Sequence, residues 1–385
     1  MVIFVGDIIK KKLLCVITAR ASYSRIRTVL LNLKNNSDLD VTICLSASAS
    51  DPLYGDLLEI LKDDGFTLIN VFENNLSQTS STTSIKVVAL SLLDIEVFLR
   101  VNEFDGVISI ADRYETIATA ICASFTNTKL FHIQGGEISG NIDDKVRNAI
   151  SMMADVHFPA TDLSEQNLIR YGIDSHDIYQ YGCPSVDQFV SQSNGSSKLS
   201  FEKLITEKSV GHAKFQYGNF HIIMMHPETD KADVNEEYAA MLLNLVSESN
   251  HESFLWFWPN SDPASSYISK TLRAYRESNE CKNVNFVKNL PPSQFVYLLN
   301  GARSLIGNSS LGVRETAVTG LPVLNIGCRQ KDRESHDNVI HCEWDSRAIS
   351  SSFEKIKSLN RNVPDYKYGK GNAGELIAKK IGEIL

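Results

Sequence analysis

The chain of 385 residues is long enough for about two domains, since single domains commonly span about 100–200 residues. Its 43% hydrophobic and 22% charged residues are ordinary globular values, which excludes a disordered or fibrous protein. Because 46 acidic residues outnumber 38 Lys and Arg, giving a net charge of −8, we expect neither nucleic acid nor an anionic membrane as a partner.

The first third of the chain alternates short apolar runs with amphipathic stretches. Continuous apolar strands separated by helices are typical of a parallel sheet that is covered on both faces. The pattern predicts strands at 12–18, 40–45, 105–110 and 129–133, and helices at 23–35, 57–63 and 116–125.

The alternation restarts in the second half, after a polar stretch at 191–197 that we interpret as a surface linker. It predicts strands at 220–225, 254–258, 285–287, 304–306 and 322–326, and helices at 236–247, 292–300 and 312–319. The expected fold class is α/β, with two Rossmann-like domains that face a cleft. We expect an N-terminal domain at 1–188, a nucleotide-binding domain at 189–365, and a C-terminal helix within 366–385 that packs back on the first domain.

The seven cysteines are scattered without a CxxC pair, and most lie in apolar or strand-like runs, which predicts buried, reduced thiols and a cytoplasmic protein. No apolar run approaches the 18 or more residues of a membrane span. The short apolar stretch at 1–9 is followed by its lysines and not preceded by them, so we interpret it as an extension and not as a signal peptide.

A turn rich in small residues, Gly307-Asn-Ser-Ser-Leu-Gly-Val-Arg-Glu315, joins a predicted strand to a predicted helix. Small residues let backbone N–H groups approach a phosphate, and Ser309 and Ser310 add hydroxyl donors. Glu315, one turn into the predicted helix, is placed to accept two ribose hydroxyls. The alternative is an ordinary Asn-Ser turn that caps a helix.

Two further loops follow predicted strands, where the ligand crevice of an α/β sheet lies. The loop at 325–333 carries three cations, among them Arg329, which suit an anionic ligand unless the loop is simply solvated. The corner at 18–24 offers Arg20 and Ser24 to a phosphate, or a hydroxyl to cap the helix. It lacks GxGxxG, so we do not expect a dinucleotide site.

Acidic and histidine side chains follow the remaining strands. Asp112 and Arg113 come directly after one strand, Glu137 and Asp143 follow a Gly-Gly turn after another, and His226 ends a strand of the second half. Carboxylates and a histidine at one cleft suit general acid–base chemistry. Taken singly, each has a structural alternative: Asp143 as a helix N-cap and His226 as a turn residue.

Five segments in order resemble the hydrolysing UDP-N-acetylglucosamine 2-epimerase family of bacterial sialic acid and legionaminic acid pathways, over residues 12 to 385. They are ADRYE (111–115), HIQGGEISGNIDD (132–144), MMHPET (224–229), GNSSLGVRE (307–315) and NIGCRQKDR (325–333). The resemblance implies a glycosyltransferase-B fold, a nucleotide-sugar substrate with UDP favoured over GDP, no cofactor and no metal, and a homodimer or homotetramer.

The resemblance also implies a reaction. The enzyme removes the C2 proton of UDP-N-acetylglucosamine and expels UDP, and water then adds to the 2-acetamidoglucal to give N-acetylmannosamine. By position, the nucleotide and its diphosphate would be held by Arg20, Ser24, Arg113, Ser309, Ser310, Glu315 and Arg329. The catalytic end would comprise Asp112, Glu137, Asp143, Gln134 and His226.

Two residues depart from the family pattern. Gln134 stands where members carry a carboxylate or a histidine, and an amide is no general base, so either Glu137 and its neighbours carry the proton transfer or the residue was changed to trap a ligand. Ser22 stands where members often have an acidic residue, which admits a UDP- or GDP-linked 2,4-diacetamido-2,4,6-trideoxyglucose as the substrate. A glycosyltransferase of the same fold and a non-catalytic nucleotide-sugar sensor are the alternative classes.

Overall fold

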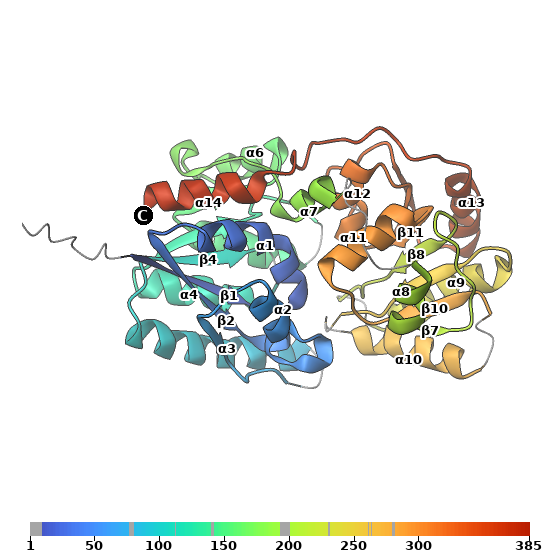
Figure 1. Cartoon of the computed structure of the whole chain (residues 1–385), viewed down its shortest axis with the longest axis horizontal. Coiled ribbons are helices and arrows are strands. Elements are labelled where there is room, and N and C mark those ends of the chain that lie inside the picture. The colour runs from blue at the N-terminus through green and yellow to red at the C-terminus, as the bar shows by residue number, and fades with distance from the viewer. Residues whose placement is uncertain are drawn as a thin grey trace, which may run out of the picture.

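The computed structural model describes residues 10–76, 81–111, 113–139, 142–192, 201–229, 232–260, 262, 264–278 and 282–385. They form two α/β units side by side, each with one central sheet and helices on both of its faces (Figure 1). The units follow one another in the chain, except that the C-terminal helix returns to the first unit.

The N-terminal sheet is parallel throughout, in the order β3-β2-β1-β4-β5-β6. Alternate residues of β1 enter two apolar cores, since Leu13 and Cys15 pack towards α1 while Leu14 and Val16 pack towards α3 and α4. Its strands are β1 (Lys11–Ile17), β2 (Leu39–Leu45), β3 (Ile69–Val71), β4 (Gly106–Ile110), β5 (Lys129–Ile133) and β6 (Val156–Phe158). Its helices are α1 (Arg20–Lys34), α2 (Leu57–Asp63), α3 (Ser81–Val101), α4 (Thr116–Phe125), α5 (Ile142–Met153) and α6 (Asp162–Arg170).

The C-terminal sheet has the order β13-β12-β11-β8-β9-β10-β7, with only β7 antiparallel among the described strands. Two apolar cores again lie on its opposite faces. The strands are β7 (Ser209–Gly211), β8 (His221–Met224), β9 (Phe254–Phe257), β10 (Val284–Val287), β11 (Ser304–Gly307), β12 (Val323–Ile326) and β13 (Val339–Cys342). The helices are α8 (Phe201–Lys208), α9 (Val234–Glu248), α10 (Ser265–Glu277), α11 (Pro292–Gly301), α12 (Glu315–Thr319) and α13 (Ser346–Lys357).

Helix α7 (Pro184–Gln192) connects the units, and the tail after α13 crosses back so that α14 (Ala373–Ile384) lies against α1 (Figure 1). The carboxylate of Asp187 on α7 accepts hydrogen bonds from the backbone N–H groups of Ala373 and Gly374, at 3.1 and 2.7 Å. A negative charge at the amino end of a helix is favourable, which fixes where α14 begins. The predicted domain boundary at 188/189 falls inside α7 and stays a prediction, while part of the predicted linker, 193–197, lies outside the described residues.

One predicted element is wrong in detail. The sequence predicts a single helix at 312–319, but the chain forms a 3₁₀ turn at Ser310–Gly312 and then the short helix α12, which begins at Glu315. Ser309 caps the turn through its hydroxyl, which accepts from the N–H of Leu311 at 3.4 Å. Glu315 is therefore the first residue of α12 and does not lie a turn inside it.

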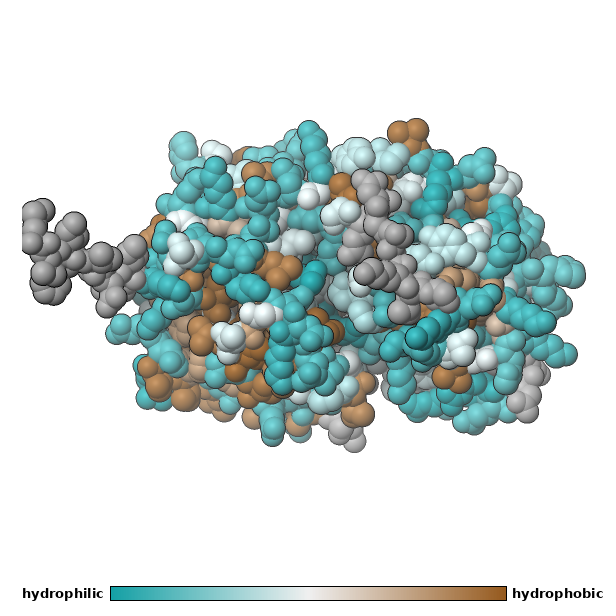
Figure 2. Space-filling model, in the orientation of Figure 1, coloured by the Kyte–Doolittle hydropathy of each residue, from teal (hydrophilic) through white to brown (hydrophobic). Residues whose placement is uncertain are grey.

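The surface of the N-terminal unit carries an apolar area. Figure 2 shows hydrophobic residues gathered at the lower left, the side on which Figure 1 places α3 and α4. On α3, Leu90, Leu93, Val97 and Val101 are exposed while Ile95 and Leu99 are buried. Helix α3 thus has apolar side chains on both faces, which blurs the period by which a helix is recognised in a sequence.

Candidate functional site

A cleft of about 1460 Å³ lies between the two units. Each sheet reverses its strand order at one point, between β1 and β4 in the N-terminal sheet and between β8 and β11 in the C-terminal sheet. Ligands of open α/β sheets bind at such switch points, beyond the carboxyl ends of the strands. Nine of the residues predicted for the site line this cleft: Arg20, Ser24, Arg113, Asp143, His226, Ser309, Ser310, Glu315 and Arg329.

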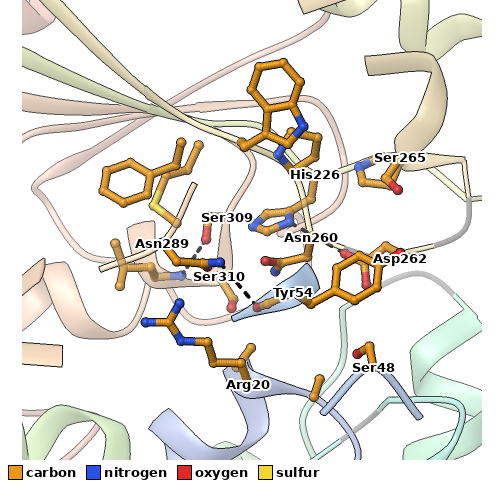
Figure 3. Close-up of a pocket in the computed structure, with 18 of the residues that line it drawn as sticks. Arg20, Ser48, Tyr54, His226, Asn260, Asp262, Ser265, Asn289, Ser309 and Ser310 are labelled. Carbon is orange, nitrogen blue, oxygen red and sulfur yellow. Dashed lines mark hydrogen bonds and ion pairs between the residues drawn. The ribbon is translucent and has the colours of Figure 1, made fainter. Parts of the chain in front are cut away.

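The turn after β11 forms one wall of the cleft. Gly307 has φ +135°, and a Cβ atom there would lie 2.1 Å from the carbonyl oxygen of Met224, so only glycine fits. The side chain of Asn308 holds the backbone of His226, accepting from its N–H at 2.7 Å and donating to its carbonyl at 2.9 Å. This turn presents Ser309 and Ser310 to the cleft (Figure 3).

Glu315 lies beside these serines with 7% of its surface exposed. Its Oε2 atom is buried and has no hydrogen-bond partner among the described residues. An unpaired buried carboxylate oxygen is costly, so an acceptor of this kind on a cleft wall is suited to donors from a ligand. Hydroxyl groups of a ribose are donors of the required kind.

Cationic side chains reach the cleft from both units. Arg20, the first residue of α1, donates to the carbonyl oxygen of Leu290 across the cleft, and burial lowers its pKa without neutralising it. Arg329, beyond β12, lies 3.5 Å from the carbonyl oxygen of Asn308. Ser24 does not cap α1, because its hydroxyl donates to the carbonyl of Arg20 at 3.4 Å. The cleft therefore has positive charge at the end where the serines lie.

A buried ionic chain crosses the cleft from Glu115 to Asp262. Arg113 donates to both carboxylate oxygens of Glu115, at 3.1 and 3.0 Å, and to Oδ1 of Asp262 at 2.7 Å. Oδ2 of Asp262 lies 3.6 Å from Nδ1 of His226, as the dashed line in Figure 3 marks. Burial would raise the pKa of Asp262, but the charge of Arg113 and the contact with His226 hold that pKa far below its usual range.

Gln134 and Glu137 do not line the cleft but lie buried beside it. The Gln134 amide donates to Sγ of Cys183 at 2.9 Å and accepts from Arg314 at 3.1 Å. Glu137 is paired through Oε2 with Arg314 and Arg333, each at 3.1 Å. In this conformation both side chains join the two units, and neither faces the space that a sugar would fill.

The other two predicted carboxylates are Asp143 and Asp112. Asp143, in the first turn of α5, lines the cleft. Its neighbour Asp144 faces inward, where it accepts from the N–H and the hydroxyl of Ser139 at 2.9 and 2.6 Å and pairs with Arg147 at 2.5 Å. Asp112 lies outside the described residues.

Sequence reasoning missed Asp262, Arg314 and the pairing role of Arg333. Asp262 follows β9 at the same sheet edge as His226, so the rule that led to His226 also applied to the polar run after the strand at 254–258. Arg314 lies inside the recognised turn but was overlooked between Ser310 and Glu315. Its contact with Gln134 joins positions 180 residues apart, which no local pattern indicates.

An α/β fold whose cleft presents a turn of small residues, hydroxyl groups and cations is typical of proteins that bind nucleotides. The family model described as "UDP-N-acetylglucosamine 2-epimerase" matches residues 31–382. The chain therefore belongs to the UDP-N-acetylglucosamine 2-epimerase family, which confirms the resemblance. None of the helices in the described ranges has the length and apolar character that a membrane span requires.

Individual relatives match over nearly the whole chain. UDP-N,N'-diacetylbacillosamine 2-epimerase (hydrolyzing) of Legionella pneumophila is 29% identical, over 95% of this chain and 94% of its own length. UDP-N-acetylglucosamine 2-epimerase of Neisseria meningitidis serogroup B is 25% identical, over 97% and 95%. The crystal structure of a Neisseria meningitidis UDP-GlcNAc 2-epimerase bound to UDP-GlcNAc superposes with a TM-score of 0.79 at 18% identity, covering 97% of this chain and 100% of that one. This likeness confirms the predicted fold of two Rossmann-like domains.

Proposed function

We propose that this protein is a hydrolysing 2-epimerase, which converts UDP-N-acetylglucosamine to N-acetylmannosamine and UDP. The observation that supports the proposal is one cleft lined by Glu315, whose buried Oε2 has no described partner, by two serines, by cations and by the carboxylate of Asp143. Glu315 binds the ribose, and Ser309, Ser310 and Arg20 bind the diphosphate.

The reaction needs a base at C2 and stabilisation of the leaving diphosphate. Asp143 is the residue among the described carboxylates on the cleft wall to which we assign proton exchange with the sugar, with Asp112 as its proposed partner. The C1–O bond breaks towards the diphosphate as the C2 proton leaves, and water then adds across the resulting double bond with C2 inverted. Arg20, Arg329 and the serines stabilise the charge that gathers on the diphosphate.

The test is incubation with UDP-N-acetylglucosamine in deuterated water, without an acceptor. Free UDP together with N-acetylmannosamine that carries deuterium at C2 is the expected result. Formation of UDP-N-acetylmannosamine without free UDP would mean a non-hydrolysing epimerase. Release of UDP only when an acceptor is added would mean a glycosyltransferase. Binding without turnover would mean a sensor.

A second substrate has a specific observation in its favour. Ser22 is buried on the cleft wall, and its side chain is smaller than the acidic residue that the family resemblance places there. The Legionella relative is named for a diacetamido sugar nucleotide, and a Campylobacter jejuni relative that is 25% identical over 90% of this chain is named for its GDP or UDP form. Measuring kcat/KM for both sugars, each with UDP and GDP, decides between them. Ser22→Asp is expected to shift the ratio towards UDP-N-acetylglucosamine by about tenfold or more.

A further inference from the structure

His226 and Asp262 come from adjacent loops of the C-terminal unit (Figure 3). His226 follows β8 and Asp262 follows β9, and these two strands pair in parallel. The side chains are 13% and 16% exposed, and Nδ1 of the ring lies 3.6 Å from Oδ2 of the carboxylate. Such a contact is slightly long for a hydrogen bond, and contacts of this kind commonly shorten when a ligand closes the site.

Each oxygen of Asp262 has a different partner. Oδ1 accepts from Nη1 of Arg113 at 2.7 Å, and Oδ2 faces the histidine ring. Arg113 belongs to the N-terminal unit, where the carboxylate of Glu115 fixes its guanidinium with two hydrogen bonds. The carboxylate that orients His226 is thus itself oriented from across the cleft.

The backbone of His226 is held by hydrogen bonds from the turn after β11. The side chain of Asn308 bonds both the N–H and the carbonyl of His226, and the carbonyl of Asn308 accepts from Gln330 at 3.0 Å. With the backbone fixed, Nδ1 of the ring faces Oδ2 of Asp262 at 3.6 Å. The remaining ring nitrogen, Nε2, is the atom available for a ligand.

We propose that Asp262 is a positioning residue that acts through His226, holding the ring so that its Nε2–H donates a hydrogen bond to the departing diphosphate. The inference rests on the proposed function. As the C1–O bond breaks, its electron pair passes to the phosphate oxygen, and the C2 proton goes to the cleft carboxylate. The Nε2–H of the protonated His226 ring donates to that oxygen, while the carboxylate of Asp262 stabilises the positive charge that the imidazolium already carries.

The charges around the ring determine the direction of its titration. Burial lowers the pKa of His226, Asp262 opposes this, and Arg329 and Arg25 lower the pKa further. Arg113 is paired with Oδ1 of the same Asp262 carboxylate. Removal of the Asp262 charge therefore lowers the pKa of His226. Because the protonated ring assists the departure of UDP in this proposal, activity is lost as the pH rises through the pKa of His226. Without the Asp262 charge that pKa is lower, so activity is lost at a lower pH.

The experiment compares Asp262→Asn with a matched control, Glu252→Gln. Glu252 pairs with His221 at 3.2 Å at the opposite end of β8, outside the cleft. For Asp262→Asn we expect kcat at pH 7.5 to fall about 10–100-fold, KM and UDP affinity to stay within about threefold, and the alkaline limb of kcat to move down by about one pH unit. Glu252→Gln is expected to leave that limb unchanged.

A titration of His226 by NMR in the unliganded chain tests the contact without turnover. The His226 signal is assigned from a His226→Gln spectrum, and Asp262→Asn is expected to lower its pKa by about one unit. An unchanged pKa together with an unchanged alkaline limb would overturn the inference. If the unmodified chain releases no UDP while the NMR shift occurs, the pairing holds and the proposed function fails.

Discussion

Arg314 donates a hydrogen bond of 3.1 Å from Nη1 to the side-chain oxygen of Gln134 in the opposite unit. Through Nη2 the same guanidinium pairs with Glu137 at 3.1 Å, and the Gln134 amide nitrogen donates to Sγ of Cys183 at 2.9 Å. Gln134, 1% exposed, thus uses both ends of its amide. A carboxylate at this position can accept from Arg314 but cannot donate to Cys183.

The first prediction concerns Gln134→Glu. Because residue 134 does not line the cleft, the substitution is expected to leave turnover within about threefold of its value or to lower it, instead of giving the about 10²-fold gain of a new general base. The measurement is product formation in deuterated water by both chains. A gain in turnover near 10²-fold would contradict this prediction. It would mean that residue 134 exchanges the C2 proton, and that its buried contacts with Arg314 and Cys183 open during the reaction.

The second prediction is that Glu315→Gln weakens UDP binding by about 1–3 kcal/mol, the scale for losing a charged acceptor. The amide retains one oxygen but presents an N–H₂ group where a ribose hydroxyl needs an acceptor. Calorimetry with UDP measures the effect. Glu375→Gln, at an exposed position in the first turn of α14, is the control and is expected to leave the affinity unchanged. Equal affinities for both variants would remove Glu315 from the site.

The third prediction separates chemistry from binding. Asp143→Asn is expected to lower kcat by about 10²-fold or more, with UDP affinity changed by less than about threefold. Asp162→Asn is the matched control, since Asp162 occupies the first turn of α6 as Asp143 occupies that of α5, but lies away from the cleft. Near-equal kcat for the two folded variants would show that Asp143 has no acid–base role.

The sequence was sufficient for the inner strands of both sheets, because a strand buried on two faces is a continuous apolar run. The outer strands β3, β6, β7 and β13 were not predicted. The predicted strand 12–18 corresponds to β1 at Lys11–Ile17, and 254–258 to β9 at Phe254–Phe257. Helix α3 was not predicted, because Leu93 and Val97 are apolar residues on its exposed face. The period of 3.6 that marks a helix is hidden when both faces are apolar.

The site followed from the sequence only as far as strand ends could place it. His226 and Ser309 were recognisable because each follows a strand at the edge where ligands bind. Whether a side chain at such an edge points into the cleft is decided by tertiary partners. Glu137 was predicted as a cleft carboxylate, but in the structure Arg314 and Arg333 hold it in a buried contact between the units.

Ala264 offers a last test, at the start of α10. It directly precedes Ser265, the first residue of the helix, and has φ +68° and ψ +3°, the left-handed conformation. The left-handed conformation costs a residue with a Cβ atom about 1–2 kcal/mol, whereas glycine adopts this conformation without strain. Asp262, two residues earlier, carries the pair with Arg113, so the strained turn sits where the loop must present its carboxylate.

Ala264→Gly is therefore expected to raise the free energy of unfolding by about 0.5–1 kcal/mol, the relief of strain less the extra entropy of glycine in the unfolded chain. Urea unfolding measures the change. Ala302→Gly is the control, since Ala302 has φ −78° and ψ +151°, a conformation without strain, and glycine there is expected to lower stability by about 0.5–1 kcal/mol or more. If both variants lose stability alike, Ala264 carries no strain. Glycine at position 264 can keep the left-handed conformation, so we expect the loop to stay unchanged in Ala264→Gly. The value of kcat and the alkaline limb of its pH profile are therefore expected to match those of the unmodified chain.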